Sequence, residues 1–292
     1  MEHVQARAIR GPRAIALVGP HLSGKTKVFE AMLREAGAHA VTGDASDAAR
    51  AAGMGVEVNA ASASFMGENF TFLDCPGSIE FSAISRVVLP ACDAAIVVCE
   101  ADGKKLAALQ MILRELDALK LPRIIFLNKI DRAAGGIEDL LAALQPASRT
   151  PLVLRQLPLW QNGIVMGFID LALERAFVYR EHAPSELIEM PAEMKLTERE
   201  ARFAMLERLA DYDDALMEAL VSDMEPPRDR IFADLSRELA EGLITPVLLG
   251  AAESGSGVAR LLKALRHEVP DVAATAARLG LAAGKGLSLI HI

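Results

Sequence analysis

The sequence predicts an α/β fold in which a mostly parallel sheet is covered by helices on both faces. The first half of the chain alternates short, continuously apolar segments with amphipathic segments of helix length, which is typical of strands buried on both faces. Apolar residues make up 52% of the 292 residues, so the chain can bury a sizeable core and is not disordered throughout. Three polar strings each follow directly on an apolar segment, as ligand-binding loops do at the carboxyl ends of parallel strands.

The individual elements follow from these patterns. We expect strands at residues 14–18, 56–65, 69–73, 94–98, 124–127 and 246–249. We expect helices at residues 24–35, 79–89, 104–119, 136–144 and 257–267. The second and third strands are expected to form a hairpin that turns at Met66-Gly67-Glu68. Because the other strands alternate with helices, the sheet is otherwise predicted to be parallel.

The first polar string has the phosphate-loop pattern G-x-x-x-x-G-K-[ST]. Its residues are Gly19, Pro20, His21, Leu22, Ser23, Gly24, Lys25 and Thr26. The glycines allow successive backbone N–H groups to point at a phosphate, and the following helix adds its positive N-terminal end. Lys25 is expected to reach the β- and γ-phosphates, and Thr26 is expected to bind Mg²⁺ through its hydroxyl. The string therefore predicts nucleotide binding.

The second string, Asp74-Cys75-Pro76-Gly77, closes the strand expected at residues 69–73. A carboxylate at this position can hold a water of the Mg²⁺ ion, so we expect Asp74 to share the metal site with Thr26. The backbone N–H of Gly77 is expected to meet the γ-phosphate.

The third string, Asn128-Lys129-Ile130-Asp131, closes the strand at residues 124–127 and predicts the base. Guanine presents N1–H and N2–H₂ as adjacent donors, which the one carboxylate of Asp131 can accept together, and adenine lacks both. The stem of Lys129 can lie over the purine while its ammonium stays in water. A backbone N–H of Ala251 or Ala252 is expected to reach guanine O6.

Each string alone also fits a strand followed by a polar turn. Their order along the chain and their shared position at strand ends favour binding of GTP or GDP with Mg²⁺.

Composition excludes several other classes. A net charge of -8 gives no overall field that attracts nucleic acid, so we expect no sequence-specific nucleic-acid partner. No apolar segment approaches the roughly 20 residues of a membrane span, and the N-terminus lacks a signal-peptide pattern. Cys75, Cys92 and Cys99 lack the spacing of a zinc site or a disulfide framework. We expect a cytoplasmic monomer without a membrane partner.

The alternation of strands and helices breaks after residue 146. Strands are expected at residues 152–157, 164–169 and 172–179, and Asn162-Gly163 is a hairpin-turn signal between the first two. Thr197-Glu198-Arg199-Glu200 has the pattern of a capping box. It predicts the start of a helix with one apolar stripe formed by Phe203, Leu206, Leu209, Leu216 and Leu220. We interpret Asp211, Asp213 and Asp214 as a solvated face of that helix rather than a metal site.

These changes predict a domain division. Residues 1–147 and 243–272 are expected to form one domain, and residues 148–242 an inserted α+β subdomain. Residues 273–292 are expected to be a weakly helical linker and a tail. The last six residues, 287–292, match the translation of a common transposase sequencing adaptor, so we interpret them as an assembly artefact, with a short genuine β-tail as the alternative.

Over residues 11–272 the chain resembles the N-terminal G domain of the bacterial elongation factor G family, in particular its elongation-factor-G-like members. Besides the three strings, the resemblance rests on the segments at 72–81, 167–171 and 245–252. It implies a P-loop GTPase fold, GTP/GDP and Mg²⁺ as ligands, and the ribosome as a partner. The family's proteins have five domains, and the resemblance implies that these residues correspond to the first of them.

The chain departs from the family pattern at positions that matter for hydrolysis. Ser78 stands where the family has a histidine that orients the attacking water, and Gly55 stands where it has a switch threonine. Leu22 replaces the usual phosphate-loop aspartate, and the loop at residues 37–55 is shorter than the family's first switch. Nucleotide binding is expected to survive these changes better than hydrolysis.

Three functional hypotheses remain open on this sequence. The first is a ribosome-dependent GTPase, slow alone, that acts in translocation or ribosome disassembly. The second is a GTP-binding switch module that hydrolyses little or nothing. The third is a truncated fragment that only binds nucleotide.

Overall fold

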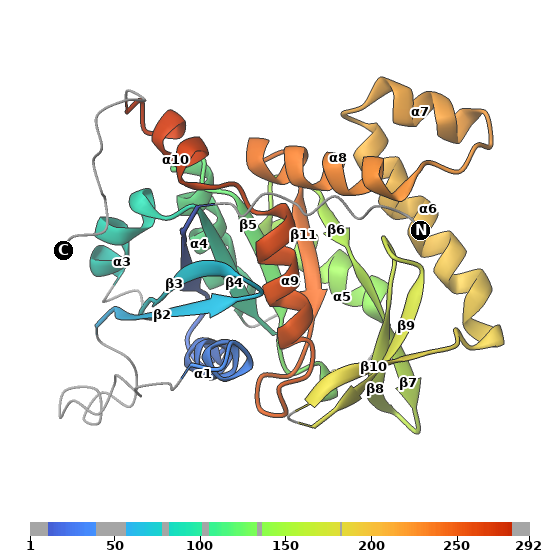
Figure 1. The fold of residues 1–292 in the computed structure, drawn as a ribbon, viewed down its shortest axis with the longest axis horizontal. Coiled ribbons are helices and arrows are strands. Elements are labelled where there is room, and N and C mark those ends of the chain that lie inside the picture. The colour runs from blue at the N-terminus through green and yellow to red at the C-terminus, as the bar shows by residue number, and fades with distance from the viewer. Residues whose placement is uncertain are drawn as a thin grey trace.

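The computed structural model describes residues 11–38, 57–77, 82–100, 105–132, 136–181 and 183–281. Its larger sheet has seven strands, and a smaller four-stranded sheet lies to one side of it (Figure 1). In spatial order the seven strands are β2 (Asn59–Phe65), β3 (Glu68–Asp74), β1 (Arg13–Val18), β4 (Ala94–Cys99), β5 (Arg123–Leu127), β11 (Thr245–Leu249) and β6 (Leu152–Leu154). Among the described strands, every neighbouring pair in this sheet is parallel except β2–β3.

Helices cover both faces of the large sheet. They are α1 (Lys25–Glu35), α3 (Ser82–Val88), α4 (Leu106–Ala118), α5 (Ile137–Leu144) and α9 (Val258–Glu268). Ile15 and Leu17 of β1 pack into one buried cluster with side chains of α1 and α9. Ala16 and Val18 face the other way and pack into a second cluster with side chains of α4 and α5. The predicted α/β fold with a mostly parallel, doubly covered sheet is confirmed.

The β2–β3 hairpin forms where the sequence predicts it. Met66 and Gly67 both have left-handed backbone conformations, with φ of 49° and 82°, as a two-residue hairpin turn requires. Strand β2 begins at Asn59. The prediction had it begin at residue 56, which lies outside the described residues.

The smaller sheet is antiparallel. Its strands are β7 (Gln156–Gln161), β8 (Ile164–Asp170), β9 (Arg175–Arg180) and β10 (Ala183–Ile188), in the order β10-β9-β8-β7. The turn at Asn162-Gly163 is present, with φ of 52° and 78°. Strand β10 was not predicted, because its side chains are half-buried or exposed and its adjacent apolar residues are only Leu187 and Ile188 at its end.

The strand predicted at residues 152–157 is two strands that belong to different sheets. Residues of β6 pair with β11 at the edge of the seven-stranded sheet, whereas β7 enters the small sheet. Arg155 lies between them, and its N–H donates to Val247 O. The predicted insert, residues 148–242, therefore contains one strand of the large sheet. The division into two domains stays a prediction. The start of the insert fits better at Arg155 than at residue 148, because the chain passes from the large sheet to the small sheet there.

The third strand of the insert was also predicted too early, at residue 172. The carboxylate of Asp170 accepts hydrogen bonds from the N–H groups of Ala172 and Leu173, at 3.1 and 3.0 Å, and these bonds hold the chain in a turn. Strand β9 therefore starts only at Arg175.

The capping-box prediction was wrong. The helical part of the insert consists of α6 (Lys195–Ala210), α7 (Asp214–Val221) and α8 (Arg228–Glu241). Thr197 lies inside the first turn of α6 rather than at its N-cap. The expected single stripe is interrupted as well, because Phe203 is 49% exposed and the helix ends at Ala210.

The three aspartates lie at this break. Asp213 is the N-cap of α7 and accepts hydrogen bonds from Ala215 and Leu216 N–H, at 3.0 and 2.9 Å. Its carboxylate also accepts a hydrogen bond from Arg230 at 2.6 Å. Asp213 therefore has a structural role, rather than lying on a solvated helix face as predicted. In the described part of the chain no group of three His, Cys, Asp or Glu side chains is placed to hold a metal ion.

Residues 272–278 form a helix that contacts the large domain. Helix α10 (Val272–Arg278) ends in Arg278, whose guanidinium donates to the carbonyls of Leu119, Pro90 and Cys92, at 3.2, 3.0 and 2.7 Å. The predicted linker is thus helical over these residues and is held against the end of α4 and the segment before β4. Residues 282–292, which include the proposed artefactual tail, lie outside the described residues.

The three cysteines are free and buried. Burial raises the pKa of the Cys75, Cys92 and Cys99 thiols to about 12, so all three are protonated at neutral pH. None of the helices in the described ranges combines the length and apolar character that crossing a bilayer requires.

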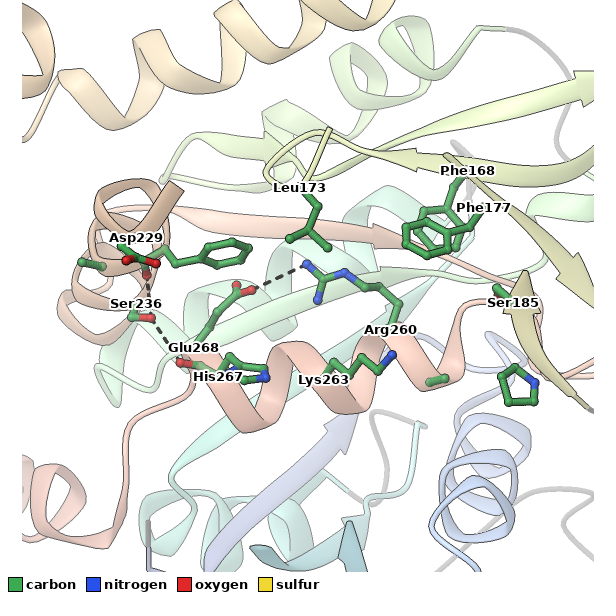
Figure 2. A pocket seen from close by; sticks show the side chains of 14 residues that line it. Phe168, Leu173, Phe177, Ser185, Asp229, Ser236, Arg260, Lys263, His267 and Glu268 are labelled. Carbon is green, nitrogen blue, oxygen red and sulfur yellow. Dashed lines mark hydrogen bonds and ion pairs between the residues drawn. The ribbon is translucent and has the colours of Figure 1, made fainter. Parts of the chain in front are cut away.

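Two buried ion pairs join α9 to the small sheet and to Arg155, the residue before it. Arg155 donates to Glu268 at 2.5 Å, and Arg260 donates to Asp170. Burial by itself would raise the pKa of Asp170, but the neighbouring Arg260 and Arg155 lower it overall. Arg260 also lies 3.9 Å from Glu268, a contact that Figure 2 shows. The four side chains therefore form one network of balanced charge.

A cavity of about 740 Å³ lies beside this network, between the small sheet, α8 and α9. Phe168 and Phe177 close one end of it, and Lys263 and His267 line it from α9 (Figure 2). None of the predicted nucleotide-binding residues lines this cavity.

We predict that Asp170→Asn destabilises the protein by about 3–5 kcal/mol at pH 7, because it leaves two buried guanidinium groups with one carboxylate between them. The matched control is Glu186→Gln, which removes a carboxylate from an exposed pair with Arg180 and should cost at most about 1 kcal/mol. Urea unfolding of both variants and the wild type measures the difference.

The pH dependence provides a second check. The pKa of Asp170 is lower in the folded protein than in the unfolded chain. Its ionised carboxylate therefore contributes fully to the free energy of unfolding above about pH 4, and this contribution is lost as the pH falls through the folded pKa. The acid loss of stability should therefore be shallower in Asp170→Asn. Equal costs for the two variants at pH 7 would show that the buried network is not required for stability.

Candidate nucleotide-binding site

The predicted phosphate loop joins β1 to α1 as expected. Gly24 has a left-handed backbone conformation, with φ of 91°, and directly precedes the helix. A Cβ atom at Gly24 would lie 2.5 Å from the Asn128 side-chain nitrogen, so only glycine fits this position without a shift. Gly24 provides no side-chain cap for α1. The first amides of the helix are therefore suited to bind an anion.

Lys25 is buried beneath the loop. Its Nζ donates to Gly19 O at 3.2 Å and to Pro20 O at 3.3 Å. Burial lowers the pKa of Lys25, and the nearby Asp74 carboxylate counters part of this effect. The ammonium therefore lies between the loop and the second polar string, where a phosphate group would be its strongest partner.

The second string approaches the loop closely. A Cβ atom at Gly77 would lie 2.1 Å from Lys25 Nζ and 3.0 Å from Gly19 O. Cys75 N–H donates to Leu17 O at 3.0 Å and continues the pairing of β3 with β1 past Asp74. Gly77 therefore allows residues 74–77 to lie against the phosphate loop.

The two predicted Mg²⁺ ligands are in contact. Thr26 Oγ1 donates to Asp74 Oδ2 at 2.7 Å. A hydroxyl and a carboxylate placed together fit a hard cation that takes its remaining ligands from phosphate oxygens and water. A cavity of about 200 Å³ opens beside them, lined by His21, Leu22, Gly24, Lys25, Thr26, Lys27, Glu57, Asp74, Cys75, Pro76 and Gly77. Glu57 was not predicted, because it belongs to no motif.

The third string is tied to the phosphate loop through Asn128. This buried side chain donates from Nδ2 to Ser23 O at 2.9 Å and accepts at Oδ1 from Ala252 N–H at 3.0 Å. Lys129 Nζ donates to Leu22 O at 3.0 Å, and its backbone has φ of 60°. The loops after β1, β5 and β11 therefore meet at one edge of the sheet, as predicted.

Asp131 lies at the surface of this edge. It is in a short 3₁₀ turn, Ile130–Arg132, and its side chain is 44% exposed with Oδ2 3.5 Å from Arg132 Nε. The carboxylate is thus accessible to a base that binds beside it.

The amides predicted to reach guanine O6 have partners within the protein. Ala251 N–H donates to Ser256 O at 3.0 Å, and Ala252 N–H donates to Asn128 Oδ1. Donation to the base would compete with these bonds, so the roles of Ala251 and Ala252 stay predictions. Ser78 and Gly55, the positions that depart from the family pattern, lie outside the described residues.

Comparisons with known proteins agree with this geometry. Residues 11–271 match the family model described as the elongation factor Tu GTP binding domain. The chain belongs to this family. An elongation factor G-like protein from Synechocystis sp. is 40% identical over 278 residues, which is 92% of this chain and 42% of the relative. Elongation factor G from Rhodopirellula baltica is 27% identical over 263 residues, which is 85% of this chain and 38% of the relative.

A solved structure supports the same assignment. A crystal structure of a protein from Thermus thermophilus matches 89% of this chain and 40% of its own, with a TM-score of 0.80 and 28% identity. The resemblance to the G domain of elongation-factor-G-like proteins is therefore confirmed. The chain spans about two fifths of the length of these relatives.

We predict that Gly24→Ala destabilises the protein more than Gly37→Ala. Both positions have a left-handed backbone, so a side chain costs about 1–2 kcal/mol at either. A Cβ atom at Gly37 meets nothing within 4 Å, whereas one at Gly24 pushes against Asn128 and should cost about 1–3 kcal/mol more. Urea unfolding without nucleotide measures both costs, and equal losses would contradict the close contact with Asn128.

Proposed function

We propose that this chain binds GTP and GDP with Mg²⁺ as the G domain of an elongation-factor-G-like translational GTPase that acts on the ribosome. The observation that carries the proposal is the Asn128 side chain, which joins the phosphate loop to the loop after β11. A nucleotide would then contact its phosphate and base sites on one continuous surface.

Each end of the nucleotide has a matching group. Lys25 and the amides at the start of α1 would bind the phosphates, and the Gly77 N–H would approach the last of them. Thr26 and Asp74 would hold Mg²⁺, which supplies positive charge to the β- and γ-phosphate oxygens when bound. The described residues support this fit, because the hydroxyl and carboxylate already lie 2.7 Å apart.

Slow hydrolysis is part of the proposal. In phosphoryl transfer the protein contributes mainly position and charge, and a group that orients the attacking water is one of the few parts it must supply. Serine at position 78 has a stem too short to reach where an imidazole would, and glycine at position 55 offers Mg²⁺ no hydroxyl. The second candidate function is a GTP-binding switch module that hydrolyses little GTP. Ser78 and Gly55 are the residues that favour it.

Action on the ribosome rests on the family alone. The chain spans about two fifths of the length of its relatives. A role in translocation or ribosome disassembly is therefore proposed from the family and not from the contacts of the described residues.

We predict that the protein binds GDP at least about a hundredfold more tightly than ADP, because ADP leaves the Asp131 carboxylate unmatched. Asp131→Asn should shift the preference toward xanthosine diphosphate, whose 2-oxo group accepts a hydrogen bond where guanine donates one. The matched control, Asp211→Asn on the exposed end of α6, should leave all three affinities unchanged. Calorimetry that gives equal affinities for GDP and ADP in the wild type would contradict a guanine site.

We also predict slow single-turnover GTP hydrolysis that Ser78→His accelerates. Restoring one group that orients the water is expected to stabilise the transition state by about 2–3 kcal/mol, or roughly a hundredfold in rate. Ser222→His, at the exposed C-cap of α7, is the control and should have no effect. Rates are measured with and without ribosomes. An intrinsic wild-type rate near the typical enzyme turnover of about 10 s⁻¹ would show that other residues position the water.

A further inference from the structure

Glu100 connects the end of β4 to the candidate base site. It directly follows Cys99, and its side chain is only 20% exposed. Its Oε1 accepts hydrogen bonds from Lys129 Nζ at 2.9 Å and from Lys105 Nζ at 2.7 Å. Nothing in the sequence singled out Glu100, because it lies in no motif.

The Lys129 ammonium is therefore held from two sides. Besides Glu100 it contacts Leu22 O at 3.0 Å in the phosphate loop. One hydrogen bond fixes it to the end of β4 and the other to the loop after β1. Two charge-assisted contacts in different directions restrict a long side chain that would otherwise sample many rotamers.

Charge balance explains why a carboxylate is needed here. Lys105 and Lys129 both donate to one oxygen, so two ammonium groups lie close together. Burial by itself would raise the pKa of Glu100, but the hydrogen bonds and charges of the two lysines lower it overall. Without the negative charge the two lysines would repel each other, and Lys129, the more exposed of the two, would keep only its hydrogen bond to Leu22 O.

We propose that Glu100 is a positioning residue for purine binding. It holds the Lys129 ammonium so that the aliphatic stem lies across the base site and provides an apolar surface for the purine. This inference rests on the proposed function. Glu100 acts through Lys129, so it affects how long a purine stays bound, whereas Asp131 determines which purine is preferred.

The test is the dissociation rate of N-methylanthraniloyl-GDP, measured by stopped flow with excess unlabelled GDP. Glu100→Gln keeps the size of the side chain but removes its charge, and dissociation should become about tenfold faster, as expected when one charge-assisted hydrogen bond is lost. Lys105→Gln is the matched control. Lys105 shares the carboxylate, but within the described residues its ammonium donates to Glu100 and not to Leu22 or the 128–131 turn, so its loss should change the rate less than twofold.

A second measurement separates positioning of the base from damage to the phosphate loop. Pyrophosphate has no base, so its affinity by calorimetry should be the same in Glu100→Gln and the wild type. The GDP-to-xanthosine-diphosphate affinity ratio should also be unchanged. An unchanged dissociation rate in Glu100→Gln, or an equal loss of pyrophosphate and GDP affinity, would overturn the inference. If the wild type fails to bind the labelled GDP, the proposed function fails and this inference fails with it.

Discussion

The candidate site depends on one side-chain amide. Asn128 is buried where three loops converge, and it uses both ends of its amide, donating to Ser23 O and accepting from Ala252 N–H. An amide is the smallest side-chain group that both donates and accepts in a fixed plane. A carboxylate at this position would face Ser23 O with a second acceptor, and an apolar side chain would leave both backbone groups unpaired in a buried place. The close approach of Gly24 to Asn128 follows from the same convergence.

The sheet makes this convergence possible. Because β1, β3, β5 and β11 all run parallel, their carboxyl ends lie at one edge, and residues more than a hundred positions apart in the chain come into contact there. The sequence predicts this much because parallel strands buried on both faces leave a plain signal of continuous apolar residues. Glycine, lysine and threonine in the phosphate loop, and carboxylates at strand ends, are likewise dictated by chemistry that local sequence can express.

Other features depend on tertiary contacts and leave no local signal. Glu100 meets Lys129 because β4 lies next to β5 in the sheet, which chain order does not reveal. Strand β10 has no apolar face to predict it, since it is stabilised by pairing with β9 at the sheet edge. The Thr-x-x-Glu pattern at Thr197 gave a wrong helix start, because this pattern also occurs within helices. Helix α6 begins two residues earlier, at Lys195. Arg155 could not be assigned to a sheet from sequence because it lies where the chain passes from one sheet to the other.

Helix α9 has a mechanical consequence. It starts at the loop that contacts Asn128 and carries Arg260 and Glu268, whose buried partners belong to the small sheet and the residue before it. Breaking such pairs costs several kcal/mol, so thermal motion does not uncouple the helix from that sheet. At the N-terminal end of the helix, Gly257 packs so closely that a Cβ atom would lie 2.2 Å from Leu249 O, so the helix start is held tightly against the end of β11. The helix is roughly 16 Å long and is fixed at both ends. A movement of the small sheet is therefore transmitted through it to the loop where the purine would lie.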